Sequence, residues 1–257
     1  MAHIMLAITS NMASNKIEVG MFKNKRILVI GGSSGIGEAT ALRASEEGAI
    51  VTIASRTEER LQSALLRLPA GTLSSVLDVR DSLQVKDFFN KHKAWDHVIL
   101  TGSATQVGSI NSLPIDQAHE AMQSKFWGAY YVGKYAQINK GGSLTFVSGV
   151  YAQKPDVNAV LQGALNAGVE GLMRGLALEL SPASVRVNAV SPSTTDTPLW
   201  NRLGEAGRAM KFSTMEKRLL TSKVAAAEDI AQAILYVSSN PSTTGSTILV
   251  DGGDALV

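Results

Sequence analysis

Four apolar residues near the N-terminal end of this 257-residue chain run directly into a glycine-rich turn. Residues 27–30 have strand length, and the turn opens a stretch with helical periodicity. A strand that delivers such a turn to a helix lets the backbone approach a pyrophosphate and aims free N–H groups at it. The pattern therefore predicts a dinucleotide-binding unit, with expected contacts from Gly31, Ser33, Ser34, Gly35, Ile36 and Gly37.

Short apolar runs alternate with longer amphipathic stretches along the rest of the chain. The expected strands are 26–30, 50–54, 73–77, 97–100, 143–148, 185–190 and 247–250, and helical spacers such as 37–47, 58–68 and 82–91 separate them. This order favours right-handed βαβ crossovers and a parallel sheet covered on both faces. We expect an α/β fold: a single-domain, doubly wound sheet of about seven strands, the Rossmann fold.

No linker or repeat divides the chain, so we expect one domain over residues 22–257. Residues 1–21 are expected to be a disordered tail, natural or left over from cloning, with Met12 or Met21 as the natural start. One irregular insertion, around 191–221, contains two prolines and several large apolar residues. Its position after the sixth strand predicts a substrate lid, although an oligomer contact would explain the same residues.

The composition excludes several classes of protein. The net charge is only +2 with no dense basic block, so we expect no nucleic-acid partner. Cysteine is absent, and the four histidines lack metal-ligand spacing, so we expect neither disulfides nor a metal site. No apolar stretch approaches membrane-spanning length. The sequence predicts a soluble, cytoplasmic protein that acts on a small molecule.

The end of the second expected strand indicates which nicotinamide cofactor binds. An acidic residue there would accept hydrogen bonds from both ribose hydroxyls and favour NAD. This chain has Ser55 and Arg56 instead, and a guanidinium can pair with a 2′-phosphate. NADP(H) is therefore the expected cofactor, unless Arg56 is merely a solvated charge at the entry of a helix.

Together these features resemble the short-chain dehydrogenase/reductase family, from about Phe22 to the end of the chain. The glycine spacing matches the family fingerprint, although Ile30 stands where a threonine is common. Further matches are Asp78-Val79, residues 163–180 of the central helix, residues 185–192 and residues 250–253. The resemblance implies a homotetramer or dimer. It also implies cofactor contacts from Asp78, Val79, Thr101, Gly102, Ser103, Asn166, Pro192, Thr195 and Thr197.

The resemblance breaks where the family carries its acid–base pair. Its members use a tyrosine whose pKa is lowered by a lysine four residues later on the same helix, and a serine on the preceding strand binds the substrate oxygen. Alignment puts Gln162 at the tyrosine position and Asn166 at the lysine position, while Ser148 keeps the serine position. A glutamine has no proton to titrate near neutral pH, so the usual proton transfer is lost.

Lys125 aligns with an asparagine of the family and is the ionisable group brought closest to the expected site. Desolvation would lower its pKa, so it could act as a general acid or stabilise an oxyanion. The alternative is a helix-surface lysine whose ammonium reaches water.

Two tyrosine–lysine pairs imitate the missing pair. Tyr130 and Lys134 have the right offset but belong to an earlier helix, where we expect a subunit contact. Tyr151 lies three residues before Lys154 in a loop that could still reach a substrate, so Tyr151 stays a catalytic candidate together with Ser148, Lys125 and Gln162.

Three functions fit this pattern. The first is an NADP(H)-dependent oxidoreductase acting on a small carbonyl, imine or alcohol, and an iminium would need no proton donor. The second is a repurposed scaffold that keeps the nucleotide for a non-redox reaction, as the resemblance to divergent family members allows. The third is a non-catalytic nucleotide-binding protein.

Overall fold

A computed structural model describes residues 20–102 and 107–257. The predicted tail therefore lies outside the described residues, apart from Gly20 and Met21. Seven parallel strands form the main sheet, in the order β3-β2-β1-β4-β5-β6-β9. The predicted Rossmann fold is confirmed. Its strands are β1 (Arg26–Ile30), β2 (Ile50–Ser55), β3 (Leu73–Val76), β4 (Trp95–Leu100), β5 (Ile138–Val147), β6 (Arg186–Pro192) and β9 (Thr247–Val250).

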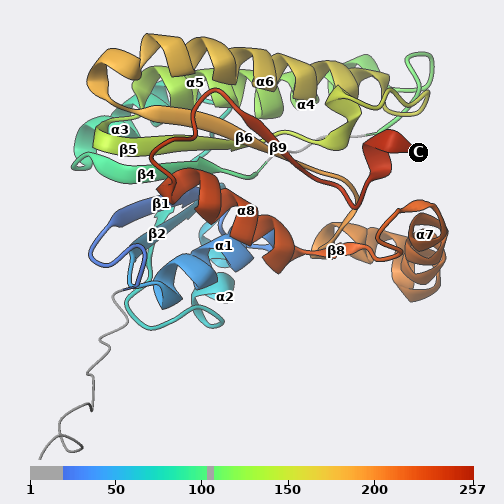
Figure 1. Ribbon diagram of the computed structural model, residues 1–257, viewed down its shortest axis with the longest axis horizontal. Helices are drawn as coiled ribbons and strands as arrows, with labels where there is room; N and C mark the ends of the chain where they lie inside the picture. Colours follow the sequence, from blue (N-terminus) through green and yellow to red (C-terminus); the bar gives the residue numbers. More distant parts are fainter. Residues whose placement is uncertain (1–19, 103–106) are drawn as a thin grey trace, which may run out of the picture.

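Helices cover both faces of the sheet (Figure 1). On one face lie α3 (Ser82–Lys91), α4 (Ile115–Met122), α5 (Gly128–Tyr135) and α6 (Val160–Glu179). On the other lie α1 (Gly35–Glu46), α2 (Glu58–Leu65) and α8 (Ala227–Ser239). Between α4 and α5 runs a π-helical turn, η1 (Gln123–Trp127). Such turns are rare and are frequent at functional sites.

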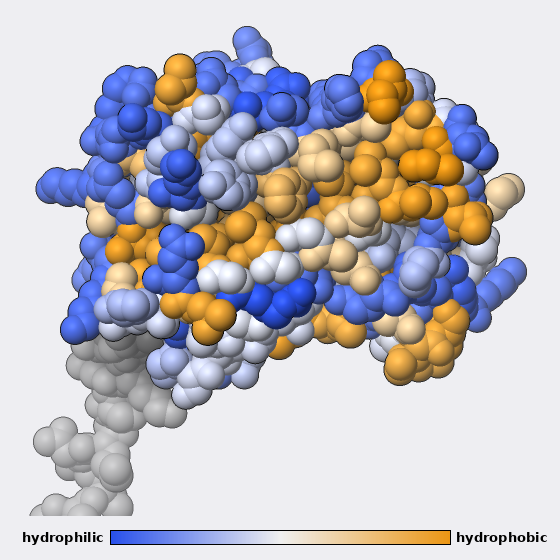
Figure 2. Space-filling model, turned by 90° about the horizontal axis from the view of Figure 1, so that it is seen from above, coloured by the Kyte–Doolittle hydropathy of each residue, from blue (hydrophilic) through white to orange (hydrophobic). Residues whose placement is uncertain are grey.

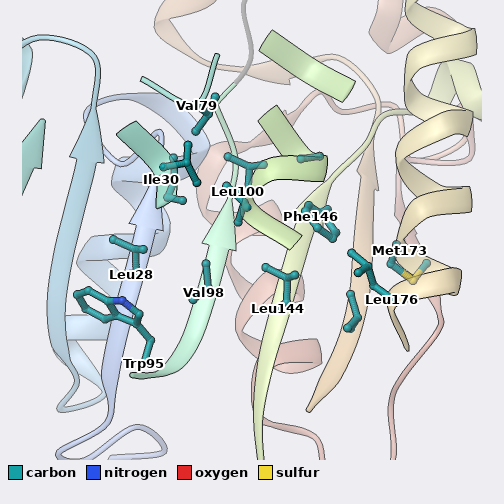
Figure 3. Packing of buried hydrophobic residues seen from close by; sticks show 14 of the residues in the cluster. Leu28, Ile30, Val79, Trp95, Val98, Leu100, Leu144, Phe146, Met173 and Leu176 are labelled. Atoms are coloured by element: carbon teal, nitrogen blue, oxygen red, sulfur yellow. The ribbon is translucent and has the colours of Figure 1, made fainter. Parts of the chain in front are cut away.

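The alternation of side chains along each strand produces two cores. In β1, Leu28 and Ile30 pack toward α3, α5 and α6, whereas Ile27 and Val29 pack toward α1, α2 and α8. Figure 3 shows the first core, where Val98, Leu100, Leu144 and Phe146 continue the layer from strand to strand. Because the central strands are buried on both faces, they are rich in apolar residues, as parallel sheets require, and several of the polar residues among them are themselves buried.

The predicted lid region contains more regular structure than its prolines suggested. It begins with a short strand, β7 (Thr195–Asp196), which pairs with β8 (Ala225–Ala226) in a separate two-stranded sheet. Between these strands lie a 3₁₀ segment, η4 (Pro198–Leu203), and the helix α7 (Gly204–Arg218). In Figure 1, α7 lies to one side of the main sheet, beside the carboxyl ends of its strands.

His97 is a buried polar residue of β4. Its Nδ1 lies 2.9 Å from the Ser143 hydroxyl, and its ring packs edge-on against Phe22 at 5.2 Å. Burial, together with the charge of Arg186, lowers the pKa of His97 to about 4. His97 is thus a neutral packing residue at physiological pH.

This pKa predicts a loss of stability in mild acid. An unfolded histidine has a pKa near 6.5, so between about pH 6.5 and 4 the unfolded chain binds more protons than the folded one. The free energy of unfolding should fall over this window by at most about 3 kcal/mol from His97 alone. Urea unfolding at pH 7 and pH 4.5 measures it. Between pH 7 and pH 4.5, the free energy of unfolding of His97→Gln should fall by less than that of the native chain. That of the exposed control His119→Gln should fall by as much as that of the native chain.

Candidate active site

A pocket of about 160 Å³ opens at the carboxyl ends of β1, β2 and β4. The strand order reverses between β1 and β4, and in open α/β sheets ligands bind at such a switch point. The pocket collects predicted cofactor residues from the ends of four strands, β1 to β4. Its lining is Ile30, Gly31, Ser33, Ser34, Ser55, Arg56, Arg60, Leu77, Asp78, Val79, Arg80, Gly102 and Ser124.

The glycine-rich turn is packed too tightly for side chains. Gly31 has a φ of +87°, and a Cβ built on it would lie 2.4 Å from the Gly102 nitrogen. A Cβ on Gly37 would lie 2.1 Å from the Gly31 oxygen. Thr101 holds the turn from β4, since its nitrogen and hydroxyl both donate to the Ile30 carbonyl, at 2.9 and 3.1 Å. The turn therefore presents bare backbone and the start of α1 to the pocket.

The end of β2 contributes two cations to the pocket. Arg56 and Arg60 are exposed, lie four residues apart where α2 begins, and have no carboxylate within 4 Å in the described ranges. Asp78 is instead engaged by Arg80, whose Nη2 lies 2.6 Å from Oδ2. Burial alone would raise the pKa of Asp78, but the hydrogen bonds from Arg80 outweigh it and the pKa is lowered. Arg60, four residues after Arg56, could have been found from helical spacing.

The predicted contacts after β6 lie on the opposite side of the turn. Thr197 packs against it, because a Cβ on Gly35 would lie 3.2 Å from the Thr197 Cβ. Thr195 is buried and donates to the Ser193 carbonyl at 3.1 Å, and Pro192 ends β6. Ser103 lies outside the described residues, so its predicted contact stays a prediction.

The helix α6 contains neither tyrosine nor lysine, and its amides are conspicuously unsatisfied. Asn166 is 1% exposed, yet neither Oδ1 nor Nδ2 has a hydrogen-bond partner among residues 20–102 and 107–257. The buried Oε1 of Gln162 likewise has none there. A buried amide without a partner costs about 1–3 kcal/mol, so an adjacent ribose hydroxyl would stabilise the fold.

The hydroxyl of Ser148 does not point where the family resemblance implies. It donates to Glu170 Oε1 of α6 at 2.8 Å, and Ser148 is only 6% exposed. The direction toward Asn166 belongs to the next residue, Gly149, whose Cβ would lie 2.7 Å from Asn166 Nδ2. Successive residues of extended chain point to opposite faces, so Ser148 and Gly149 point in opposite directions. A catalytic role for Ser148 through a free hydroxyl would first require that bond to Glu170 to break.

Lys125 is not the surface lysine that the alternative interpretation allowed. It is 8% exposed, and its Nζ donates to the carbonyls of Val147 and Ser148 at 2.8 and 3.0 Å. Burial lowers the pKa of Lys125 to about 8, although the charge of Glu170 opposes this. Beside it lies a cavity of about 10 Å³, room for one water at most, which also touches Gly102 of the cofactor pocket.

Neither imitation pair reproduces a lysine-assisted tyrosine. Burial and the charges of Asp156 and Asp254 raise the pKa of Tyr151, which keeps the phenol protonated. The Lys154 ammonium is held by Asp254 Oδ1 at 2.9 Å. Tyr130 lies on α5 and is 39% exposed. Sequence reasoning missed Glu170, although its place four residues after Asn166 puts both on one helical face.

Comparison with known proteins agrees with the fold. The family model described as enoyl-(acyl carrier protein) reductase matches residues 31–254. The chain belongs to the short-chain dehydrogenase/reductase family. A curated relative, the short-chain dehydrogenase/reductase malC of Malbranchea aurantiaca, is 30% identical, and the match covers 94% of this chain and 98% of that protein.

Solved structures extend the comparison to this fold. The MalC reductase/Diels–Alderase superimposes with a TM-score of 0.83 at 29% identity, covering 93% of this chain and 99% of that one. A small-chain dehydrogenase in complex with NADPH gives 0.80 at 34%, covering 91% and 100%. An NADPH-bound oxidoreductase of Pseudomonas aeruginosa PAO1, described as containing an atypical catalytic center, gives 0.83 at 29%, covering 90% and 98%.

Other features restrict the site further. Of the helices in the described ranges, none combines the length and hydropathy that crossing a bilayer requires. Within those same ranges, no three His, Cys, Asp or Glu residues gather as metal ligands would. The bare turn and the unpartnered Asn166 amide both fit a dinucleotide whose pyrophosphate and ribose lie along this edge of the sheet.

The contact between Gly149 and Asn166 predicts that they cannot be changed independently. Gly149→Ala places a methyl group against the Asn166 amide and should lower the free energy of unfolding by about 1–3 kcal/mol. In the double variant with Asn166→Ala most of that loss should disappear, and urea unfolding of the four proteins gives the coupling energy. Gly175→Ala on α6 meets nothing within 4 Å and is the control. Strictly additive losses would contradict the contact.

Proposed function

We propose that this protein is an NADP(H)-dependent oxidoreductase of a small carbonyl, imine or alcohol, with a rearranged proton donor. The observation that carries the proposal is the pocket itself, in which a bare glycine turn faces two arginines that lack carboxylate partners in the described chain. The NADPH complexes among its structural neighbours support the same cofactor.

The cofactor, when bound, supplies the hydride. The turn and the first N–H groups of α1 bind its pyrophosphate, and Arg56 binds the 2′-phosphate with Arg60 beside it. The Nδ2 of Asn166 donates a hydrogen bond to the nicotinamide ribose, and its Oδ1 accepts one from a ribose hydroxyl. Asn166 can thus hydrogen-bond the ribose, but unlike the family lysine it carries no charge.

Lys125 is the proposed proton source. Negative charge develops on the substrate oxygen during reduction, and a cation nearby stabilises it. With a pKa of about 8, Lys125 is mostly protonated near neutral pH and still a competent acid. The cavity between its ammonium and Gly102 gives room for one water to carry the proton toward the cleft.

An iminium substrate is the alternative within this function. It accepts the hydride directly and leaves a neutral amine, so no proton donor is required. That chemistry matches the absence of tyrosine and lysine from α6. Under this alternative, Lys125 only stabilises the carboxyl end of β5.

The segments around the pocket complete the proposal. We assign 191–221 to substrate enclosure, with Leu199, Leu203 and Met210 exposed on it. We also expect a homodimer or homotetramer through the α4–α6 side. Figure 2 views this side and shows a broad hydrophobic band. The exposed large hydrophobic residues of α4, η1, α5 and α6 are Ile115, Met122, Trp127, Tyr130, Val160 and Leu178. A cytoplasmic location stays a prediction.

A second function keeps the pocket but abandons hydride transfer. The relative MalC is described as both reductase and Diels–Alderase. In this chain, Gln162 and Asn166 would then hold the nucleotide as a fixed charge or wall beside a non-redox reaction. Tight NADP(H) binding without any nicotinamide turnover would favour this function, or a non-catalytic nucleotide-binding protein, over the first.

The cofactor proposal predicts the effect of Arg56→Ala. Loss of a charged hydrogen bond to the 2′-phosphate should weaken NADPH binding by about 10- to 100-fold and leave NADH binding unchanged. Isothermal titration calorimetry with both cofactors measures this change. Arg174→Ala, an exposed arginine of α6, is the control and should bind both as the native chain does. Equal losses for NADPH and NADH would show that Arg56 does not contact the phosphate.

The catalytic proposal predicts the effect of Lys125→Met. Absorbance at the nicotinamide band should report turnover of NADPH or NADP with a panel of carbonyls, alcohols and cyclic imines. With carbonyls, Lys125→Met should reduce kcat by about 100-fold or more, in the range of general acid catalysis. The native rate of carbonyl reduction should fall as the pH rises through about 8, where Lys125 loses its proton. Unchanged kcat with carbonyls would refute Lys125 as the acid.

A further inference from the structure

Ser148 lies between two buried, oppositely charged side chains. Its carbonyl accepts from Lys125 Nζ at 3.0 Å, and its hydroxyl donates to Glu170 Oε1 at 2.8 Å. All three residues are nearly excluded from solvent: Lys125 is 8% exposed, Ser148 6% and Glu170 5%. The ammonium comes from η1 and the carboxylate from α6, so the end of β5 is held from two elements.

Glu170 is expensive to bury unless its charge is compensated. Its second oxygen accepts from Gln153 Nε2 at 2.9 Å, so both oxygens have neutral hydrogen-bond donors. These neutral donors do not compensate the negative charge of the Glu170 carboxylate. Lys125 is the cation that faces it across Ser148, and the interaction between the two charges is favourable.

Among the described residues, the small cavity beside Lys125 has no charged residue other than Lys125 in its lining. The cavity beside it is lined by Leu100 and Gly102 at the end of β4, Ala129 of α5, Phe146 and Val147 of β5, and Val169 of α6. None of these carries a titratable group. Burial lowers the pKa of Lys125, and within the described chain Glu170 is the charged residue that opposes this shift.

We infer that Glu170 is a positioning residue: its carboxylate keeps the Lys125 ammonium charged at neutral pH and commits the Ser148 hydroxyl hydrogen to α6. This inference rests on the proposed function, in which Lys125 is the acid. Ser148 is then an acceptor only, so it offers no proton to a substrate oxygen. Under the proposed function, the proton for a carbonyl substrate then comes from Lys125.

The charge state of Lys125 can be measured without any turnover. In protein labelled with ¹⁵N-lysine, the Nζ resonance of Lys125, assigned by its absence in Lys125→Met, is followed against pH. The native midpoint should lie near 8. Glu170→Gln removes an opposite charge and should lower the midpoint by roughly one unit. Glu170→Asp keeps the charge and should stay close to the native value.

Two further variants keep the test decisive. Glu179→Gln neutralises an exposed glutamate on the same helix and should leave the midpoint unchanged. If Glu170→Gln fails to fold, Glu170→Met removes the charge without a competing amide. A native-like midpoint in both charge-free variants would overturn the inference.

The pH profile connects the pair to catalysis. With a carbonyl substrate, the fall of kcat at high pH should begin about one unit lower in Glu170→Gln than in the native chain. A role in folding alone would lower the amount of active enzyme at every pH without moving this limb. A lowered Nζ midpoint together with full activity of Lys125→Met would support the charge pairing but refute the proposed acid.

Discussion

The close approach of β1 and β4 at their carboxyl ends is the constraint on which this structure depends. The Gly31 backbone comes so near to Gly102 that the space between them leaves no room for a side chain at 31. Thr101 fastens the two strands through the Ile30 carbonyl. The strand order reverses between β1 and β4, and ligands bind at such a reversal in open α/β sheets. The pocket therefore lies beside the contact between these two strands.

The sequence predicted the parts of the fold that depend on local pattern. The strands 26–30 and 247–250 and the helix 82–91 were placed to the residue, because apolar runs bounded by polar turns leave little freedom. The β7–β8 pair was not predicted, since a two-residue strand carries no periodicity. The π-helical turn at 123–127 was also missed, since a single π-helical turn between two α-helices has no hydrophobic periodicity of its own.

The sequence predicted the pocket-lining residues of the candidate site better than it predicted the residues around Ser148. The glycine turn and Arg56 follow directly from a strand and its neighbouring helix, and the structure places both in one pocket. The direction of the Ser148 hydroxyl was not predictable. A shift of one residue in strand register would exchange the directions of Ser148 and Gly149. The contacts with Glu170 and Asn166 of α6 show that Ser148 faces the first and Gly149 the second.

The altered residues of this site are adjusted to one another, which argues against simple decay of a lost activity. The Asn166 amide fills the space that a Cβ at 149 would need, so glycine and asparagine are complementary in volume. The Lys125 ammonium is capped by two carbonyls and faces a buried carboxylate, so its charge is accommodated too. Among the described residues, buried side-chain atoms without a hydrogen-bond partner occur in Gln162 and Asn166, both on α6, and also in Trp95 and Thr247. Independent loss of function would leave mismatched volumes and unpaired charges throughout. The unmet hydrogen bonds of Gln162 and Asn166 are ones that a bound ligand would supply.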